Sequence, residues 1–145
     1  MTDALSTIKT VLSDNWTAGN TDSITPTFTL QGDFEYKQFD LKNGDLVKIY
    51  EVGENWRPFD IGKNTWERVN IISIECLTTY KNATLSTRRA HLDKMIAEVI
   101  RIVKANVSDP DANFKELLPV RKSDRSSDKT GIARMVLDVS LKEWG

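Results

Sequence analysis

The stretch from residue 87 to 107 restricts the fold most, because its apolar residues recur at helical spacing and form a single stripe. The stripe consists of Leu92, Met95, Ile96, Val99, Ile102 and Val103. Ser86 or Thr87 can cap this helix, and Asn106 followed by Asp109-Pro110 marks its end. A helix with one apolar face has to be packed against another element, so the rest of the chain must supply that element.

The rest of the chain reads mostly as strands. Strands or extended segments are expected at residues 27–30, 34–37, 46–52, 68–79 and 132–141. The β-branched run at 68–79 is predicted to lie centrally in a sheet, with Ile72, Ile74 and Cys76 on one face. Ser73 and Glu75 fall on the other face, which is expected to be partly solvated or covered by a neighbour.

A second, shorter amphipathic helix is expected at residues 2–16, and the element order then defines the fold class. We expect an α+β protein with a mostly antiparallel sheet, the N-terminal helix and the long helix packed on one face, and a closing C-terminal hairpin. The hairpin is predicted to join the apolar run at 114–120, which Pro119 interrupts, to the strand at 132–141, with residues 121–131 at its charged tip. With 145 residues and 39% hydrophobic content, the chain is predicted to form a single domain over residues 1–145.

Residues 53–65 combine Gly53, Pro58 and Gly62 with aromatic side chains and are expected to form a loop between two strands. Two interpretations remain open: a lid over the edge of the core, or an exposed loop that contacts a partner. In the second case Trp56 and Arg57 would contribute most, because Trp and Arg are enriched at binding interfaces.

The sequence offers little for catalysis, and no enzyme activity and no cofactor are expected. Cys76 is the only cysteine and His91 the only histidine, so a multi-histidine metal site is excluded and Cys76 is expected to be an inert buried thiol. The glycine patterns of phosphate-binding and dinucleotide-binding loops are absent. A metal-dependent nuclease remains an alternative, with Asp45, Asp60 and Glu75 as its candidate carboxylates.

Partners and compartment are restricted by the same simple counts. The net charge of -1 is not that of a dedicated nucleic-acid binder, so no specific nucleic-acid binding is expected. The N-terminus lacks the pattern of a signal peptide, and no apolar run is long enough to span a bilayer. We therefore expect a protein made in a cytoplasm and without a membrane partner.

Charge is distributed unevenly along the chain. Residues 31–60 hold seven acids against four bases, and residues 81–104 hold six bases against two acids. These regions are either solvated faces or the two complementary sides of a head-to-tail contact between subunits. The candidate interface residues are Arg88, Arg89, Lys94 and Arg101, the acids Asp33, Glu35 and Asp40, and Trp56, Arg57, Arg121, Lys122 and Arg125 in the two predicted loops.

The order of elements resembles the tail terminator proteins of tailed phages and archaeal viruses and, more loosely, other head–tail connector proteins. The resemblance lies in the N-terminal helix, the sheet, the helix at 87–107 and the closing hairpin. It implies a virion structural protein that forms a ring, typically a hexamer, on the tail tube and contacts the tube protein and the head connector. Residues 53–65 and 121–131 would reach these partners. A small binding module that forms no ring is the alternative.

Overall fold

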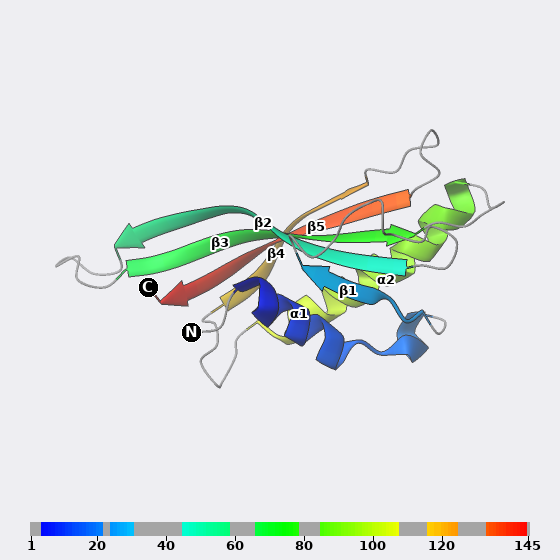
Figure 1. The fold of residues 1–145 in the computed structure, drawn as a ribbon, viewed down its shortest axis with the longest axis horizontal. Helices are drawn as coiled ribbons and strands as arrows, with labels where there is room; N and C mark the ends of the chain where they lie inside the picture. The colour runs from blue at the N-terminus through cyan, green and yellow to red at the C-terminus, as the bar shows by residue number, and fades with distance from the viewer. Residues whose placement is uncertain are drawn as a thin grey trace.

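The computed structural model describes residues 4–21, 24–30, 45–58, 66–78, 85–107, 116–124 and 133–144. The helices are α1 (Ala4–Asn15), the short 3-10 helix η1 (Ala18–Thr21) and α2 (Leu85–Ala105). The strands are β1 (Thr27–Leu30), β2 (Asp45–Pro58), β3 (Trp66–Thr78), β4 (Glu116–Asp124) and β5 (Ala133–Trp144). They form one sheet in the order β1-β2-β3-β5-β4, in which only the β1–β2 pair is parallel (Figure 1).

Both described α-helices pack on the same face of this sheet, which we call the inner face (Figure 1). The alternation of side chains along β3 and β5 places one set of apolar residues on that face. The inner-face core consists of Val47, Ile49, Ile72, Ile74, Cys76, Met135, Leu137, Val139 and Leu141. The stripe of α2 and Ile8 and Leu12 of α1 are buried against it. The α+β prediction and the central position of β3 are therefore confirmed.

The predicted loop at 53–65 is wrong in its first part, because residues 53–58 continue β2. They pair residue for residue with β3, from Gly53 opposite Ile71 to Pro58 opposite Trp66. Gly53 and Pro58 suggested a loop, but Gly53 stands next to a bulge, and Pro58 ends the strand, where its missing N–H costs least. The lid interpretation therefore does not apply to residues 53–58.

The closing hairpin is confirmed, but its predicted tip begins too early. Residues 121–124 belong to β4 and pair with β5, from Arg121 opposite Asp138 to Asp124 opposite Met135. Pro119 interrupts neither strand nor sheet, because β4 is an edge strand and a missing N–H is tolerated there.

The predicted start of the long helix needs correction. The helix begins at Leu85, so Ser86 and Thr87 are helical residues and do not cap it. On the outer face of the sheet, Ser73 and Glu75 are both buried, with 3% and 5% exposure, which agrees with the second alternative, coverage by neighbouring groups. The extended segment predicted at 34–37 lies outside the described residues.

Cys76 has the environment expected of an inert thiol. Its side chain is fully buried in the inner-face core. Burial raises the pKa of the Cys76 thiol, and the carboxylates of Glu75 and Asp45 raise it further. The thiolate that a nucleophile requires is therefore strongly disfavoured.

Replacement of Ile102 by alanine tests how far the core depends on α2. Ile102 is 0% exposed, so Ile102→Ala removes buried methyl groups and leaves a cavity, at a cost of about 2–5 kcal/mol in the free energy of unfolding. Lys104→Ala, on the exposed side of the same turn, should cost at most about 1 kcal/mol. Urea denaturation followed by circular dichroism measures both values, and equal costs would contradict the described packing of α2.

Candidate interaction surface

One group of the predicted basic residues lies where α2 passes beneath the edge strand β4. Arg89 Nε lies 3.1 Å from Asp124 Oδ2, and Lys122 Nζ lies 3.9 Å from Asp93 Oδ1. Each contact joins α2 to β4. All four side chains remain at least one-third exposed, so these pairs contribute little to stability. The basic groups are therefore anchored to the fold and still present at the surface.

Arg121 is placed on the outer face of the same edge. Its Nη2 lies 3.5 Å from Asp138 Oδ2, and 65% of its side chain is exposed. Asp138 in turn accepts a 2.6 Å hydrogen bond from Ser73 Oγ on β3. Arg121 thus forms the outer end of a polar row that crosses three strands, and most of its guanidinium is accessible to a partner.

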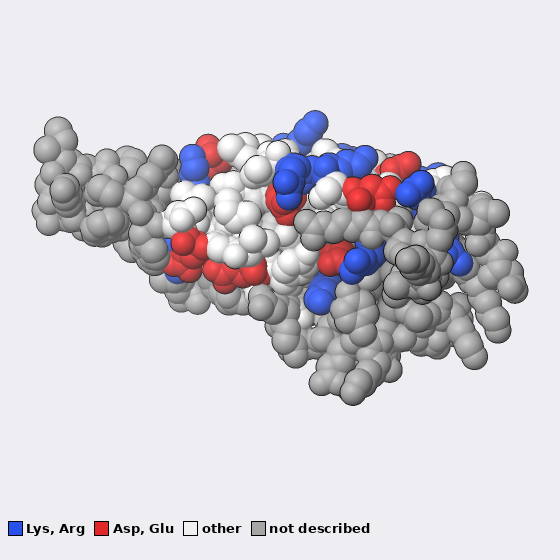
Figure 2. Space-filling view, turned by 90° about the horizontal axis from the view of Figure 1, so that it is seen from above, with Lys and Arg blue, Asp and Glu red and all other residues white. Residues whose placement is uncertain are grey.

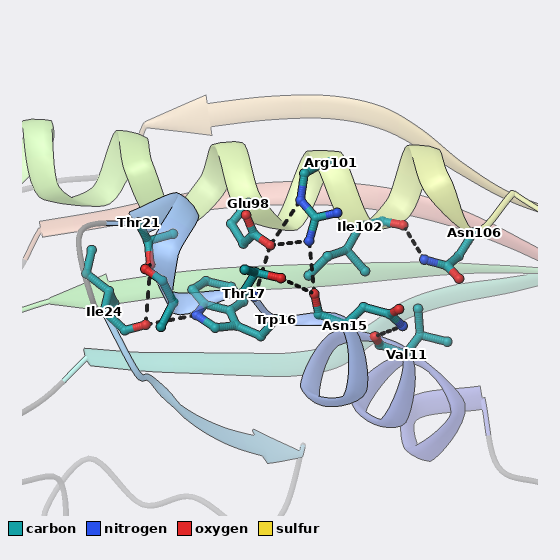
Figure 3. A network of polar contacts seen from close by, with 11 residues as sticks. Val11, Asn15, Trp16, Thr17, Thr21, Ile24, Glu98, Arg101, Ile102 and Asn106 are labelled. Carbon is teal, nitrogen blue, oxygen red and sulfur yellow. Dashed lines mark hydrogen bonds and ion pairs between the residues drawn. The ribbon is translucent and has the colours of Figure 1, made fainter.

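Arg101 differs from the other predicted interface residues, because its guanidinium connects α2 to the end of α1 (Figure 3). Its guanidinium forms an ion pair with Glu98 one turn earlier in α2. Its Nη2 also donates a 2.9 Å hydrogen bond to the carbonyl oxygen of Asn15, the last residue of α1. A helix leaves its final carbonyls without intrahelical donors, so Arg101 caps α1 from a neighbouring helix.

Glu98 completes this junction, and its role was not predicted from the sequence. Its carboxylate is buried, and its Oε1 accepts a 3.3 Å hydrogen bond from the backbone N–H of Thr17, directly after α1. The spacing of Glu98 and Arg101, three residues apart on one helix, is the signal that could have revealed the pair. The two side chains together hold the end of α1 against α2.

The chain after α1 is fixed by Trp16. The indole Nε1 donates a 2.9 Å hydrogen bond to the carbonyl oxygen of Ile24 (Figure 3). The ring also packs edge-on against Phe28 of β1, with 5.7 Å between ring centroids and 75° between the planes. Thr21 Oγ1 lies 3.3 Å from the same Ile24 oxygen. Through these contacts α1 positions β1, the strand that covers only the first part of β2.

The edge of β2 beyond β1 presents the described acidic surface. Within the described residues, β1 pairs with β2 from Leu46 to Ile49, and Glu51, Val52 and Glu54 further along β2 are exposed. The acids Asp33, Glu35 and Asp40 of the predicted acidic region lie outside the described residues. On the face shown in Figure 2, a group of acidic side chains lies along the lower left and a group of basic ones at the upper middle.

The remaining candidate residues are placed as follows. Arg88 is partly buried and Lys94 is exposed, and each has interactions within the protein. Trp56 and Arg57 lie in β2 opposite Arg68 and Glu67, and their side chains are outside the described part of the structure, as is all of Arg125. The structure therefore brings Arg89, Arg121 and Lys122 together at β4 and separates Arg101 from them.

The carboxylates considered for a nuclease do not converge. Asp45 accepts a hydrogen bond from Thr78 Oγ1 and lies 2.7 Å from His91 Nε2 on the helix side of the sheet. Glu75 lies on the outer face, 3.5 Å from Arg134 Nη1, and Asp60 is outside the described residues. Two carboxylates separated by a sheet cannot share a metal ion, and the described residues contain no cluster suited to one. No described helix is long and apolar enough to cross a bilayer.

Comparison with known proteins identifies a similar fold but assigns the chain to no family. No protein-family model matches this chain, and no curated protein matches it. Among solved structures, a chain of the "Virion of native gene transfer agent (GTA) particle" matches with a TM-score of 0.57 and 13% sequence identity. The match covers 99% of this chain and 100% of that chain. The match therefore shows that the two chains share a fold.

Acidification tests the junction between α1 and α2. Desolvation opposes the ionisation of Glu98, but hydrogen bonds from Arg101, Thr17 and Asn20 outweigh it, so the pKa of Glu98 is lower than its ordinary value of 4.5. The stabilisation is complete above 4.5 and is lost as the pH falls through the lower pKa of the folded state. Glu98→Gln should therefore lower stability at pH 7 by roughly 1–3 kcal/mol and flatten the decline below pH 4.5.

The matched control is Asp93→Asn, which alters an exposed carboxylate on the same helix. Its effect at pH 7 should be smaller, and the decline in acid should keep the wild-type slope. Thermal unfolding from pH 7 to pH 3 measures both variants. An unchanged acid profile in Glu98→Gln would show that Glu98 is not a major source of the decline.

Proposed function

We propose that this protein is a virion structural protein without enzymatic activity: a tail terminator or neck protein that forms a ring joining the tail tube to the head connector. The observation that carries the proposal is the full-length match in fold to a chain of a virion particle. The order of elements, which resembles that of tail terminators, agrees with it. The proposed location is the tail or neck of a virion.

Ring formation requires each subunit to present two different complementary surfaces. The described residues include an acidic surface on β2, at Glu51 and Glu54, and a basic one at β4 and the start of α2. They lie on opposite sides of the sheet, since β4 is one edge strand and β2, beyond its described pairing with β1, faces the other side. A heterologous contact between such surfaces repeats in one direction and can close into a ring, for which we propose a hexamer.

The separation of Asp45 from Glu75 supports a structural role over the nuclease alternative. Cleavage of DNA in the presence of Mg²⁺ or Mn²⁺ that is lost in Asp45→Asn would contradict the proposal. We expect no cleavage by the purified protein.

Assembly of the purified protein tests the proposal directly. We expect a closed oligomer in size-exclusion chromatography with light scattering, and rings in electron microscopy, either alone or after addition of the tail tube protein. In virions, labelled antibody should mark the tail or neck. A strict monomer at high concentration, both alone and with tube protein, would overturn the ring, and a protein absent from virions would leave only a binding module.

A further inference from the structure

The two bulges of the sheet each expose a valine at an opposite edge. In β2 the pairing passes from Glu51 to Gly53, so Val52 has no partner in β3. In β4 the pairing passes from Pro119 to Arg121, so Val120 has no partner in β5. Val52 is 61% exposed and Val120 is 60% exposed, the most exposed large apolar residues described. A bulge re-aims a side chain, and here both bulges direct an apolar one to solvent.

The register places these two valines at nearly the same level of the sheet. One row runs from Glu51 through Ile72 and Val139 to Pro119. Val52 follows the β2 end of this row, and Val120 follows the β4 end. Because β2 and β4 run in opposite directions, the two valines lie on opposite sides of the row, about one residue away from it in each case. Two copies placed edge to edge would therefore bring Val52 close to Val120 with only a small shift along the strands.

Charge complements this placement. Val52 is flanked by Glu51, with Glu54 two positions further, whereas Val120 is followed by Arg121 and Lys122. With Val52 opposite Val120, the antiparallel order places Glu51 one position from Lys122, and both residues belong to the inner face, since Glu51 pairs with Ile72 and Lys122 with Leu137. A contact of either edge with itself would lack this attraction, since it would gather only acids, Glu51 and Glu54, or only bases, Arg121 and Lys122.

The contact is made by side chains more than by the main chain. Pro119 has no N–H to donate, and the N–H of Leu117 is already bonded to the Val107 carbonyl oxygen at 2.8 Å. Native proteins protect edge strands by such means against continuous sheet extension. At Leu117 and Pro119 the β4 edge therefore has no N–H to offer to the ladder of another copy, which favours a defined contact over a fibre.

We propose that the β2 edge around Val52 is the docking site for the β4 edge around Val120 of a second copy of this chain. The proposal rests on the proposed function, because it names the contact through which the ring would form. It narrows the interface predicted from the charged regions 31–60 and 81–104 to two short edges. One edge consists of Glu51, Val52 and Glu54, and the other of Val120, Arg121 and Lys122.

Single-edge variants test this contact. Val52→Asp and Val120→Asp should each abolish the wild-type oligomer, since each removes one of the two edges that every subunit uses. Mixed in equal amounts at high concentration, the two variants should form a heterodimer that grows no further, because each retains the edge that the other lacks. Size-exclusion chromatography with light scattering measures the separate variants, sedimentation equilibrium at high concentration measures the mixture, and circular dichroism melting checks that both variants are folded.

Ala97→Asp is the matched control, because Ala97 is also exposed but lies in the middle of α2 and belongs to neither edge. It should assemble like the wild type. A charge exchange provides a second test. Glu51→Arg should weaken assembly, and Lys122→Glu in the same chain should restore it. This exchange still tests the contact if an aspartate variant fails to fold.

The outcomes separate this contact from the proposed function. A wild-type ring that persists in Val52→Asp, Val120→Asp and Glu51→Arg would overturn the edge contact and leave the ring intact. Loss of assembly without a heterodimer in the mixture, or without recovery in the charge swap, would also overturn the pairing of these edges. A wild-type protein that stays monomeric alone and with tube protein would overturn both proposals.

Discussion

The burial of the α2 stripe against β3 and β5 is the contact on which the remaining elements depend. It joins a helix to strands that lie before and after it in the chain, so it holds together segments from both sides of α2. The buried residues of α2 and of the two strands belong to one continuous core. At about 25 cal/mol per Å² of apolar surface, a core of this kind supplies the main favourable term in folding. α1 is added to this unit at its rim.

The attachment of α1 combines apolar burial with a polar junction at the end of the helix. Ile8 and Leu12 are buried, but the end of the helix is held by Glu98 and Arg101. Breaking one partner of such a junction leaves the other groups without their hydrogen bonds, so the pair specifies where α1 ends more than it adds net stability. Because Trp16 follows at once and positions β1, the same junction determines how much of the β2 edge is covered.

Periodicity alone predicted both long helices, the central strand and the α+β class, because each signal lies within a single element. The errors occurred where pairing between strands decides whether a segment is extended or forms a loop. Gly53 and Pro58 read as loop residues, yet the length of β3 carries β2 through them. The bulges at Val52 and Val120 depend on two residues facing one in a partner strand, which a single segment cannot show. An isolated glycine within a strand pattern, as at Gly53, was the only available hint.

The same reasoning explains why charge counts identified regions but not contacts. Residues 81–104 have an excess of bases, yet Arg101 is used to cap α1, and Arg89 is paired with Asp124 across to β4. What remains accessible is a smaller set of half-exposed charges, and such charges influence the rate and specificity of association more than its strength. A single valine on each edge buries little surface, so one contact between two copies is weak by itself. Closure supplies what the single contact lacks, because the last subunit of a ring binds through both edges at once and the second contact forms at high effective concentration.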